Sequence, residues 1–143
     1  MTFIRELAIL LSILVGLSTT GCLSRNATPT RLSLTLPFGA VDPIGEPTSD
    51  GTLTLTGWVL SDDSIQAVSF FIDGRYVTSA RLFQPRPDVN RAYPAYGVMN
   101  AGWKIEFDTR LFKGEHELLV QARTAHGAVR DLGAARRRFP DGT

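Results

Sequence analysis

Apolar and polar residues alternate on both sides of a polar corner in residues 102–125. Trp103, Ile105 and Phe107 occupy every second position before the corner, and Leu118 and Val120 do so after it. A period of two is typical of β-strands that have one face on a core and the other in water. The pattern therefore predicts two strands joined by a tight corner.

The corner, DTRLFKGEH at residues 108–116, contains the residue types that reverse a chain. Asp108 and Thr109 are expected to bind backbone donors, and Gly114 to take the left-handed conformation that a reversal requires. Leu111 is expected to plug the end of the core.

Further alternating segments predict five more strands, at residues 31–38, 52–60, 65–73, 75–81 and within 128–139. The first alternates leucines with polar residues and ends at Pro37. Asp73-Gly74 indicates a hairpin with a type I′ turn, because both residues tolerate a positive φ. Gly57, inside the second segment, indicates a bulge or a close approach of two backbones.

Two segments lack this period. Residues 39–51 are rich in Gly, Pro and Asp and are interpreted as a loop. Residues 82–101 contain three prolines and three aromatic residues without a pattern, which predicts a long crossing loop. Loops beyond about 12 to 15 residues are uncommon unless they pack on themselves or carry a function, so a binding site is sought here first.

Seven short strands separated by turn signals predict an all-β fold, an antiparallel β-sandwich of about seven strands that follows an N-terminal signal helix. No helix is expected in the folded domain. The chain has 143 residues, of which 43% are apolar and 20% charged, which suits one globular domain with an additional segment. A net charge of +1 provides no field that would attract nucleic acid, so none is expected as a partner.

The first 21 residues have the pattern of an export signal. Arg5 precedes an apolar stretch at residues 7–15, which is too short to cross a bilayer, since a crossing helix takes about 20 residues. We interpret residues 1–21 as a cleaved signal peptide.

The signal ends in Thr20-Gly21-Cys22, which resembles the lipobox of bacterial lipoproteins, although Thr19 stands where leucine is usual. The resemblance implies that Cys22, the single cysteine, is acylated and becomes the first residue of the mature chain. An ordinary secretory signal is the alternative. Leu23 in the next position points to the outer membrane of a cell that has one. Residues 22–30 then form a tether, and residues 31–139 form the folded domain.

Several landmarks in residues 31–139 are similar to the bacterial Ig-like domains of exported and cell-envelope proteins. They are Gly57-Trp58-Val59, Asp73-Gly74, Arg86-Pro87-Asp88-Val89, Tyr93-Pro94, Gly102-Trp103, Asp108-Thr109, Leu111 and Gly114-Glu115-His116. The resemblance implies an immunoglobulin- or fibronectin-type sandwich that serves as an accessory module.

Four polar residues are candidate fasteners of the loop and the corner: Arg86, Asp88, Asp108 and His116. A guanidinium can bind several carbonyls and a carboxylate several amides, which a loop without ladder partners requires. His116 also invites a catalytic reading with Asp108 and with Ser69 or Ser79. The structural role is favoured, because no nucleophile elbow or Ser-His-Asp arrangement is present.

No metal or cofactor is expected. Two isolated histidines without further thiols do not make a zinc site, and the acidic turn residues lack the spacing of a calcium loop. The run at residues 136–138, Arg-Arg-Arg, either protects an edge strand or binds an anionic lipid or glycan.

Four aromatic residues are candidate ligand contacts: Trp58, Phe83, Tyr93 and Tyr96. They would form a platform for sugar rings, or they would pack the long loop onto its sheet.

These observations predict a non-enzymatic lipoprotein of the bacterial cell envelope that carries one Ig-like interaction or structural module. Its expected partners are the membrane, through the lipid anchor, and an envelope protein or glycan. A carbohydrate-binding or adhesion module that uses residues 83–101 is the alternative, and a small hydrolase is disfavoured for lack of a site.

Overall fold

The computed structural model describes residues 35–140, and most of this range is β-strand. Its strands are β1 (Phe38–Val41), β2 (Thr52–Leu60), β3 (Ile65–Ile72), β4 (Arg75–Ser79), β5 (Arg81–Gln84), β6 (Gly102–Asp108), β7 (Gly114–Thr124) and β8 (Val129–Phe139). Its helical turns are α1 (Pro87–Ala92), η1 (Pro94–Tyr96) and η2 (Thr109–Leu111).

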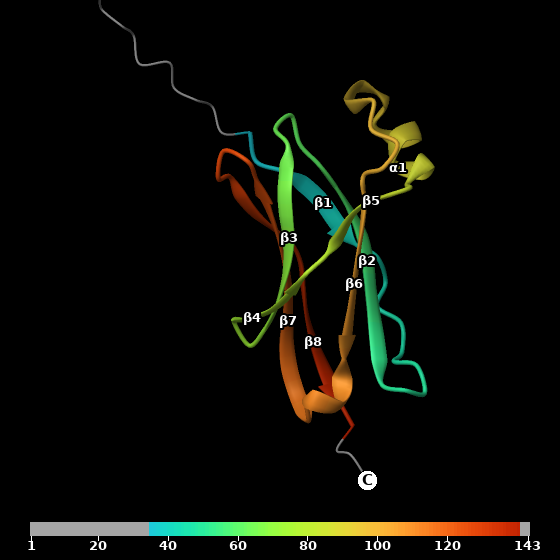
Figure 1. Ribbon diagram of the computed structural model, residues 1–143, viewed down its shortest axis with the longest axis vertical. Helices are drawn as coiled ribbons and strands as arrows, with labels where there is room; N and C mark the ends of the chain where they lie inside the picture. The colour runs from blue at the N-terminus through green and yellow to red at the C-terminus, as the bar shows by residue number, and fades with distance from the viewer. Residues whose placement is uncertain (1–34, 141–143) are drawn as a thin grey trace, which may run out of the picture. The chain divides into compact units, whose positions relative to one another are not determined.

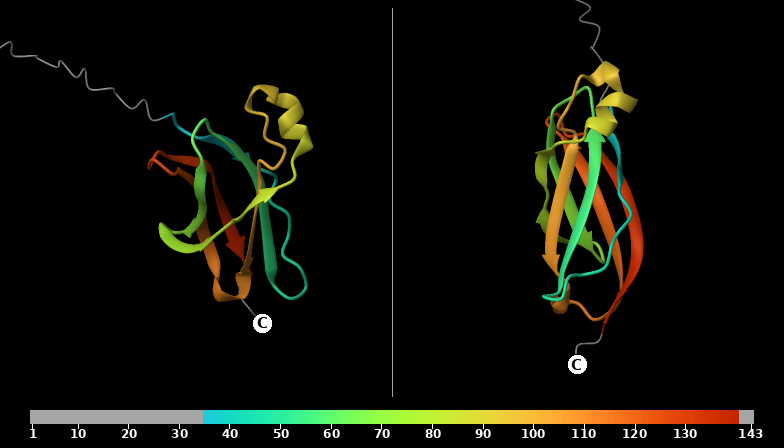
Figure 2. Two further views of the ribbon diagram at one scale, coloured as in Figure 1. Left: turned by 45° about the horizontal axis from the view of Figure 1, so that its top comes forward. Right: turned by 90° about the vertical axis from the view of Figure 1, so that its right-hand side faces the viewer.

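The strands form two sheets that face each other (Figure 1; Figure 2). One sheet has the order β1-β2-β6-β5 and the other the order β4-β3-β7-β8, and all neighbouring pairs are antiparallel. The predicted all-β antiparallel sandwich is therefore confirmed. The expected signal helix, tether and Cys22 lie outside the described residues.

The core lies between the two sheets and is built from every second side chain of the central strands. Along β2 the buried positions alternate with partly exposed ones, as the sequence pattern predicts. The largest fully buried side chains include Trp103, Phe70, Phe139, Leu53, Leu55, Ile105 and Leu118. Burying one such side chain contributes about 1.5 to 3 kcal/mol, so this set is the main source of stability.

Gly57 marks a close approach, as the sequence predicts. A Cβ atom there would lie 2.2 Å from the carbonyl oxygen of Ala40 on β1 and 2.2 Å from Cζ2 of Trp103 on β6. The missing side chain lets the buried indole ring lie directly against the backbone of β2.

The two ends of the sandwich are made by different segments. β1 begins opposite the end of β2, β3 begins opposite the end of β7, and β6 begins opposite the end of β5. We call this the N-proximal end, because the described chain starts there at Thr35; it includes residues 85–101. The other, corner end contains η2, the Asp73-Gly74 turn and residues 46–51 (Figure 1).

Two predictions about local structure are wrong. The first described strand is β1, at Phe38–Val41, so part of the expected loop at residues 39–51 is strand. Of the strand predicted at residues 31–38, residues 35–37 are not strand, and residues 31–34 lie outside the described residues. Residues 82–101 contain the end of β5 and the short helix α1, where no helix was expected. α1 buries a single residue, Val89, so it leaves no helical period in the sequence.

The prediction for Leu111 is also wrong, because its side chain is 78% exposed. Phe112 takes the expected place, packing against Phe107 and Phe139 with ring centroids 6.2 and 6.1 Å away. The corner thus turns one residue later than the pattern indicates. The Asp73-Gly74 hairpin is confirmed, with φ of 50° and 74°.

We expect Gly57→Ala to destabilise the fold by about 1 to 3 kcal/mol, because the added methyl group must displace backbone or the Trp103 ring. Denaturation by urea measures this. Gly45→Ala is the matched control, since a Cβ there meets nothing within 4 Å. Equal midpoints for the two variants would contradict the close approach.

Candidate functional site

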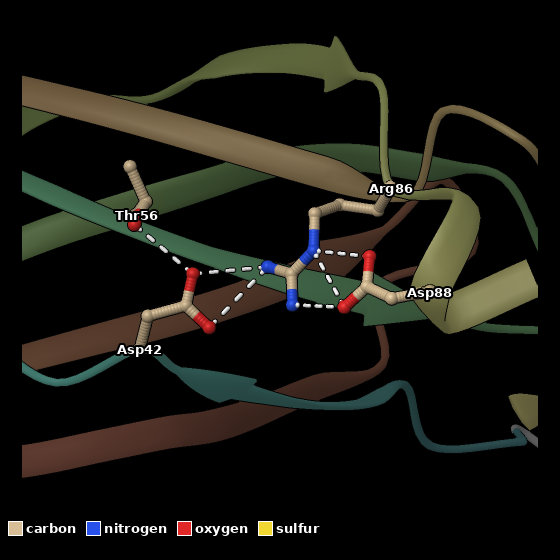
Figure 3. A network of polar contacts seen from close by, with 4 residues as sticks. All are labelled: Asp42, Thr56, Arg86 and Asp88. Atoms are coloured by element: carbon tan, nitrogen blue, oxygen red, sulfur yellow. Dashed lines mark hydrogen bonds and ion pairs between the residues drawn. The ribbon is translucent and has the colours of Figure 1, made fainter.

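The 85–101 segment is fastened to the sandwich by Arg86. Its Nη1 lies 2.9 Å from Oδ2 of Asp42, directly after β1, and its Nη2 lies 2.8 Å from Oδ2 of Asp88 in α1 (Figure 3). Its Nε donates to Asp88 Oδ1 at 2.9 Å. Thr56 of β2 donates from Oγ1 to Asp42 at 3.0 Å, which holds that carboxylate in place.

This network is a structural clamp with little room for a ligand. The Arg86 side chain is only 22% exposed and binds both carboxylates at once. Its hydrogen bonds lower the pKa of Asp88 to about 2, and its own pKa is raised by the same contacts. Arg86 and Asp88 were expected to bind backbone groups, whereas the guanidinium takes two carboxylates. Asp42 was missed, because it precedes Arg86 by 44 residues without a local signal.

Above the clamp, aromatic rings cover the outer face of β1 and β2. Phe38 meets Trp58, Tyr93 and Tyr96 edge to face, with ring centroids 5.4 to 5.7 Å apart. Trp58 and Tyr93 are tilted by 35°. Beneath these rings lie the buried Leu60, Val89 and Ala101. The rings therefore hold residues 85–101 on the sheet.

Phe83 lies apart from that cluster, although all four aromatic candidates were expected to share one surface. Its side chain is 70% exposed on β5, and it borders a hollow of about 330 Å³. The apolar part of the lining comes from Val59, Leu60, Ile65, Leu82, Val98 and Ala101, with Asp62 and Asn100 at polar positions. Three candidates are thus brought together and one is not.

At the corner end, Asp108 and Thr109 bind neighbouring backbone. Asp108 Oδ1 accepts from the amide of Arg110 at 2.9 Å, and the Arg110 guanidinium contacts the same carboxylate. These bonds lower the pKa of Asp108 to about 2. Thr109 donates from its amide and from Oγ1 to the carbonyl of Gly51, rather than accepting.

His116 has both ring nitrogens engaged. Nδ1 lies 2.6 Å from Oδ2 of Asp73 and Nε2 lies 2.9 Å from the carbonyl of Lys113. Phe112 and Phe139 pack on the ring, and the imidazole is 19% exposed. Asp73, not Asp108, is its carboxylate partner. The ring therefore links the β3–β4 turn to the corner.

A similar pair joins two turns at the N-proximal end. His126 donates from its amide to Oδ2 of Asp63 at 3.0 Å, and its Nδ1 lies 2.9 Å from Oδ1 of the same carboxylate. The bond from the His126 amide is the first cause of a strongly lowered pKa of Asp63. Both histidines of the chain thus bind aspartates across a turn.

Between residues 35 and 140, no three His, Cys, Asp or Glu side chains gather as a metal site. The polar side chains that could take part in catalysis instead make separate hydrogen bonds at different places in the fold. Ser79 shares a hydrogen bond of 3.0 Å with the hydroxyl of Tyr76, and Asp63, Asp73 and Asp108 accept from backbone amides. Asp73 and Asp63 had been recognised as turn residues, but not as partners of the histidines.

We expect Arg86→Met to loosen residues 86–101 by about 1 kcal/mol, the usual net contribution of hydrogen bonds of this kind. Hydrogen exchange of the backbone amides in this segment should accelerate. Asp88→Ala should act in the same direction but less, because Asp42 still holds Arg86. Arg91→Met is the matched control on the same helix, and an equal effect there would contradict the clamp.

The His116–Asp73 pair predicts a pH dependence of stability. The pKa of His116 is raised from 6.5, chiefly by its bond to Asp73, so its contribution is complete below about pH 6.5 and is lost as the pH rises through the native value. The pKa of Asp73 is lowered from 3.8, by the Glu117 amide and then by His116, so its contribution is lost in more acidic solution.

We therefore expect the melting temperature to fall as the pH rises above about 6.5, and Asp73→Asn to reduce this fall. The asparagine oxygen can still accept from the Glu117 amide, so the change isolates the histidine contact. Asp62→Asn, an exposed aspartate in the β2–β3 turn, is the control. An unaltered pH profile in Asp73→Asn would show that the pair contributes nothing.

No family model matches the sequence, and no curated protein matches it either. Among solved structures, the chain is similar to fibronectin(III)-like modules of Clostridium thermocellum CbhA, at 20% identity over 70% of this chain and 96% of that chain, with a TM-score of 0.45. It is also similar to the Yersinia enterocolitica Family 28 exopolygalacturonase, at 13% identity and a TM-score of 0.37, over 71% of this chain but only 20% of that chain.

The strand order itself identifies the fold. Immunoglobulin-type sandwiches pair strands A, B, E and D in one sheet and C, F and G in the other. β1, β2, β6 and β5 have the first order, and β3, β7 and β8 have the second, with β4 added as a further edge strand. Residues 35–140 therefore form an Ig-like sandwich of the immunoglobulin and fibronectin type.

Proposed function

We propose that this protein is a non-enzymatic lipoprotein of the bacterial cell envelope, whose Ig-like sandwich is an interaction or structural module. The observation that carries the proposal is the use of the polar side chains. The groups with the chemistry for catalysis, His116, His126 and their aspartates, are bonded across turns. Such fasteners stabilise a fold and leave its outer faces for binding.

The geometry of His116 argues against a hydrolase. A general base needs a ring nitrogen directed at the nucleophile or substrate. In His116, one nitrogen faces Asp73 and the other faces the carbonyl of Lys113, which can only accept a hydrogen bond. Ser69 and Ser79 lie on β3 and β4, and Ser79 is paired with Tyr76. These placements support a structural role for the histidine.

The envelope location rests on the sequence of the first 22 residues. An export signal that ends at the single cysteine supports an acylated Cys22 as the membrane anchor. Several acyl chains on one residue hold a protein durably, since each buried methylene group contributes about 0.8 kcal/mol. No helix in the described range 35–140 has the length and apolar character needed to cross a membrane.

A carbohydrate-binding role for residues 83–101 has less support. Sugar rings stack on flat, exposed aromatic faces, whereas Trp58 and Tyr93 face each other and Tyr96 packs on Phe38. Tyr93 is the most exposed of these three rings, at 39%. This geometry is better suited to holding residues 85–101 on the sheet than to stacking on a sugar.

We expect cells that express the full chain to incorporate radioactive palmitate into it, and Cys22→Ser to abolish the labelling while leaving the protein exported. The thiol of Cys22 is the acceptor, and the chain has no other cysteine. Gel fluorography with fractionation of the envelope measures both effects. Labelling that persists in Cys22→Ser, or its absence from the natural chain, would overturn the lipoprotein assignment.

A further inference from the structure

Exposed apolar side chains gather at the N-proximal end of the sandwich. Eight large apolar residues of the described range are exposed, and six of them lie at this end: Leu36, Phe83, Tyr93, Val98, Met99 and Val129. Of the other two, Tyr76 packs its ring on Phe71 and Leu111 lies at the corner end. Water-facing apolar clusters of this kind mark surfaces that contact a protein or a membrane.

Phe83 adds a second observation. Its φ is +64°, the left-handed conformation that favours glycine, at the point where β5 shifts register against β6. This backbone costs free energy, yet it presents the ring to solvent at 70% exposure instead of burying it. Strain of this kind is retained where the presented side chain has a use. The adjoining hollow, lined by Leu82 and Val98, extends the apolar surface.

The charges around this surface do not favour one sign. Arg91, Arg123 and Arg130 are exposed there, and so are Asp62 and Asp88. The arginine run at residues 136–138 lies at the other end, where β8 finishes opposite the start of β7, and Arg137 is paired with Glu46 at 2.8 Å. A contact made by the N-proximal end is therefore apolar, and salt should hardly weaken it.

The sequence indicates which surface the N-proximal end contacts. Twelve residues, 23–34, separate Cys22 from Thr35, and fully extended they reach on the order of 45 Å. An acyl anchor on Cys22 would therefore keep a bilayer within this distance of the N-proximal end. A few apolar side chains bind a membrane weakly alone, but a short tether raises their effective concentration into the range where weak contacts are populated.

We propose that the N-proximal end rests on the surface of the bilayer that holds the anchor, with Phe83, Val98 and Met99 dipping into the headgroup region. The inference deepens the proposed function and rests on its lipid anchor. In this orientation the strands run away from the membrane surface, and the corner end lies farthest from it. The contact leaves the corner end, with the exposed Leu111, for partners in the surrounding compartment.

The test supplies the anchor chemically, so that it does not depend on acylation in the cell. Residues 22–143 are coupled through Cys22, the single thiol, to a maleimide phospholipid in nanodiscs of phosphatidylcholine that contain nitroxide-labelled lipid. We expect loss of the amide NMR signals of Phe83, Val98 and Met99, and little loss at Leu111 and Lys113. The loss should be the same at low and at high salt.

Variants at matched positions show whether the apolar side chains cause the orientation. Phe83→Ser combined with Met99→Ser should reduce the signal loss at the N-proximal end, whereas Leu111→Ser, at an exposed leucine of the corner end, should not. Met99→Ser alone, in a loop position, serves if the double variant does not fold. Equal signal loss at both ends of the natural chain, or stronger loss at the corner end, would overturn the proposal.

A protein partner is the competing occupant, and crosslinking in intact cells distinguishes it. A photoreactive amino acid at Met99 should yield adducts with phospholipid, and the same amino acid at Leu111 should not. A discrete protein adduct at Met99 in place of lipid would overturn the bilayer contact. Failure of palmitate labelling would remove the anchor from the proposed function, while the nanodisc result would still report on the surface itself.

Discussion

The structure depends on the burial of alternate side chains between two facing sheets. β2 and β6 supply one wall of the core, β3 and β7 supply the other, and Gly57 of β2 leaves the room that the ring of Trp103 on β6 occupies. Because this core uses one face of each strand, the outer faces and the turns must satisfy their own polar groups. Most of the polar chemistry of the chain is explained by that demand.

Aspartate side chains provide most of the side-chain hydrogen bonds that satisfy the backbone amides of the turns, at both ends of the sandwich. Asp63, Asp73 and Asp108 each accept from a backbone amide near a turn. Asp63 also holds His126 of the β7–β8 turn, and Asp73 holds His116 near the start of β7. A carboxylate is suited to this because it accepts several bonds at once, and ionised acceptors bind more strongly than neutral ones. The same residue types would form a catalytic site only if they converged, and here they are distributed over separate turns.

The sequence predicts the strands that line the core far better than the parts that cover it. β2, β3, β6 and β7 have a clear period of two because each is buried on one face. β1 has four half-buried residues and no period. The prediction therefore placed the first strand at residues 31–38, where leucines alternate with polar residues before Pro37. Similarly, α1 has one turn and a half, and the Arg86–Asp42 bond joins residues 44 positions apart, which no local pattern records. His116 was recognisable as a corner residue, but its partner depends on how β3 and β7 pair.

Residues 85–101 show how a long connection between β5 and β6 is held to the sandwich by side-chain contacts. Its arginine binds a carboxylate on each side, its helix buries Val89, and its tyrosines meet Phe38 and Trp58 on the outer face of the sheet. Since these contacts fix the base of the segment, the residues beyond them, Val98 and Met99, are presented to solvent on a rigid support. An exposed apolar side chain on a rigid support loses less conformational entropy on contact than one on a free loop, and such a surface is therefore better suited to binding.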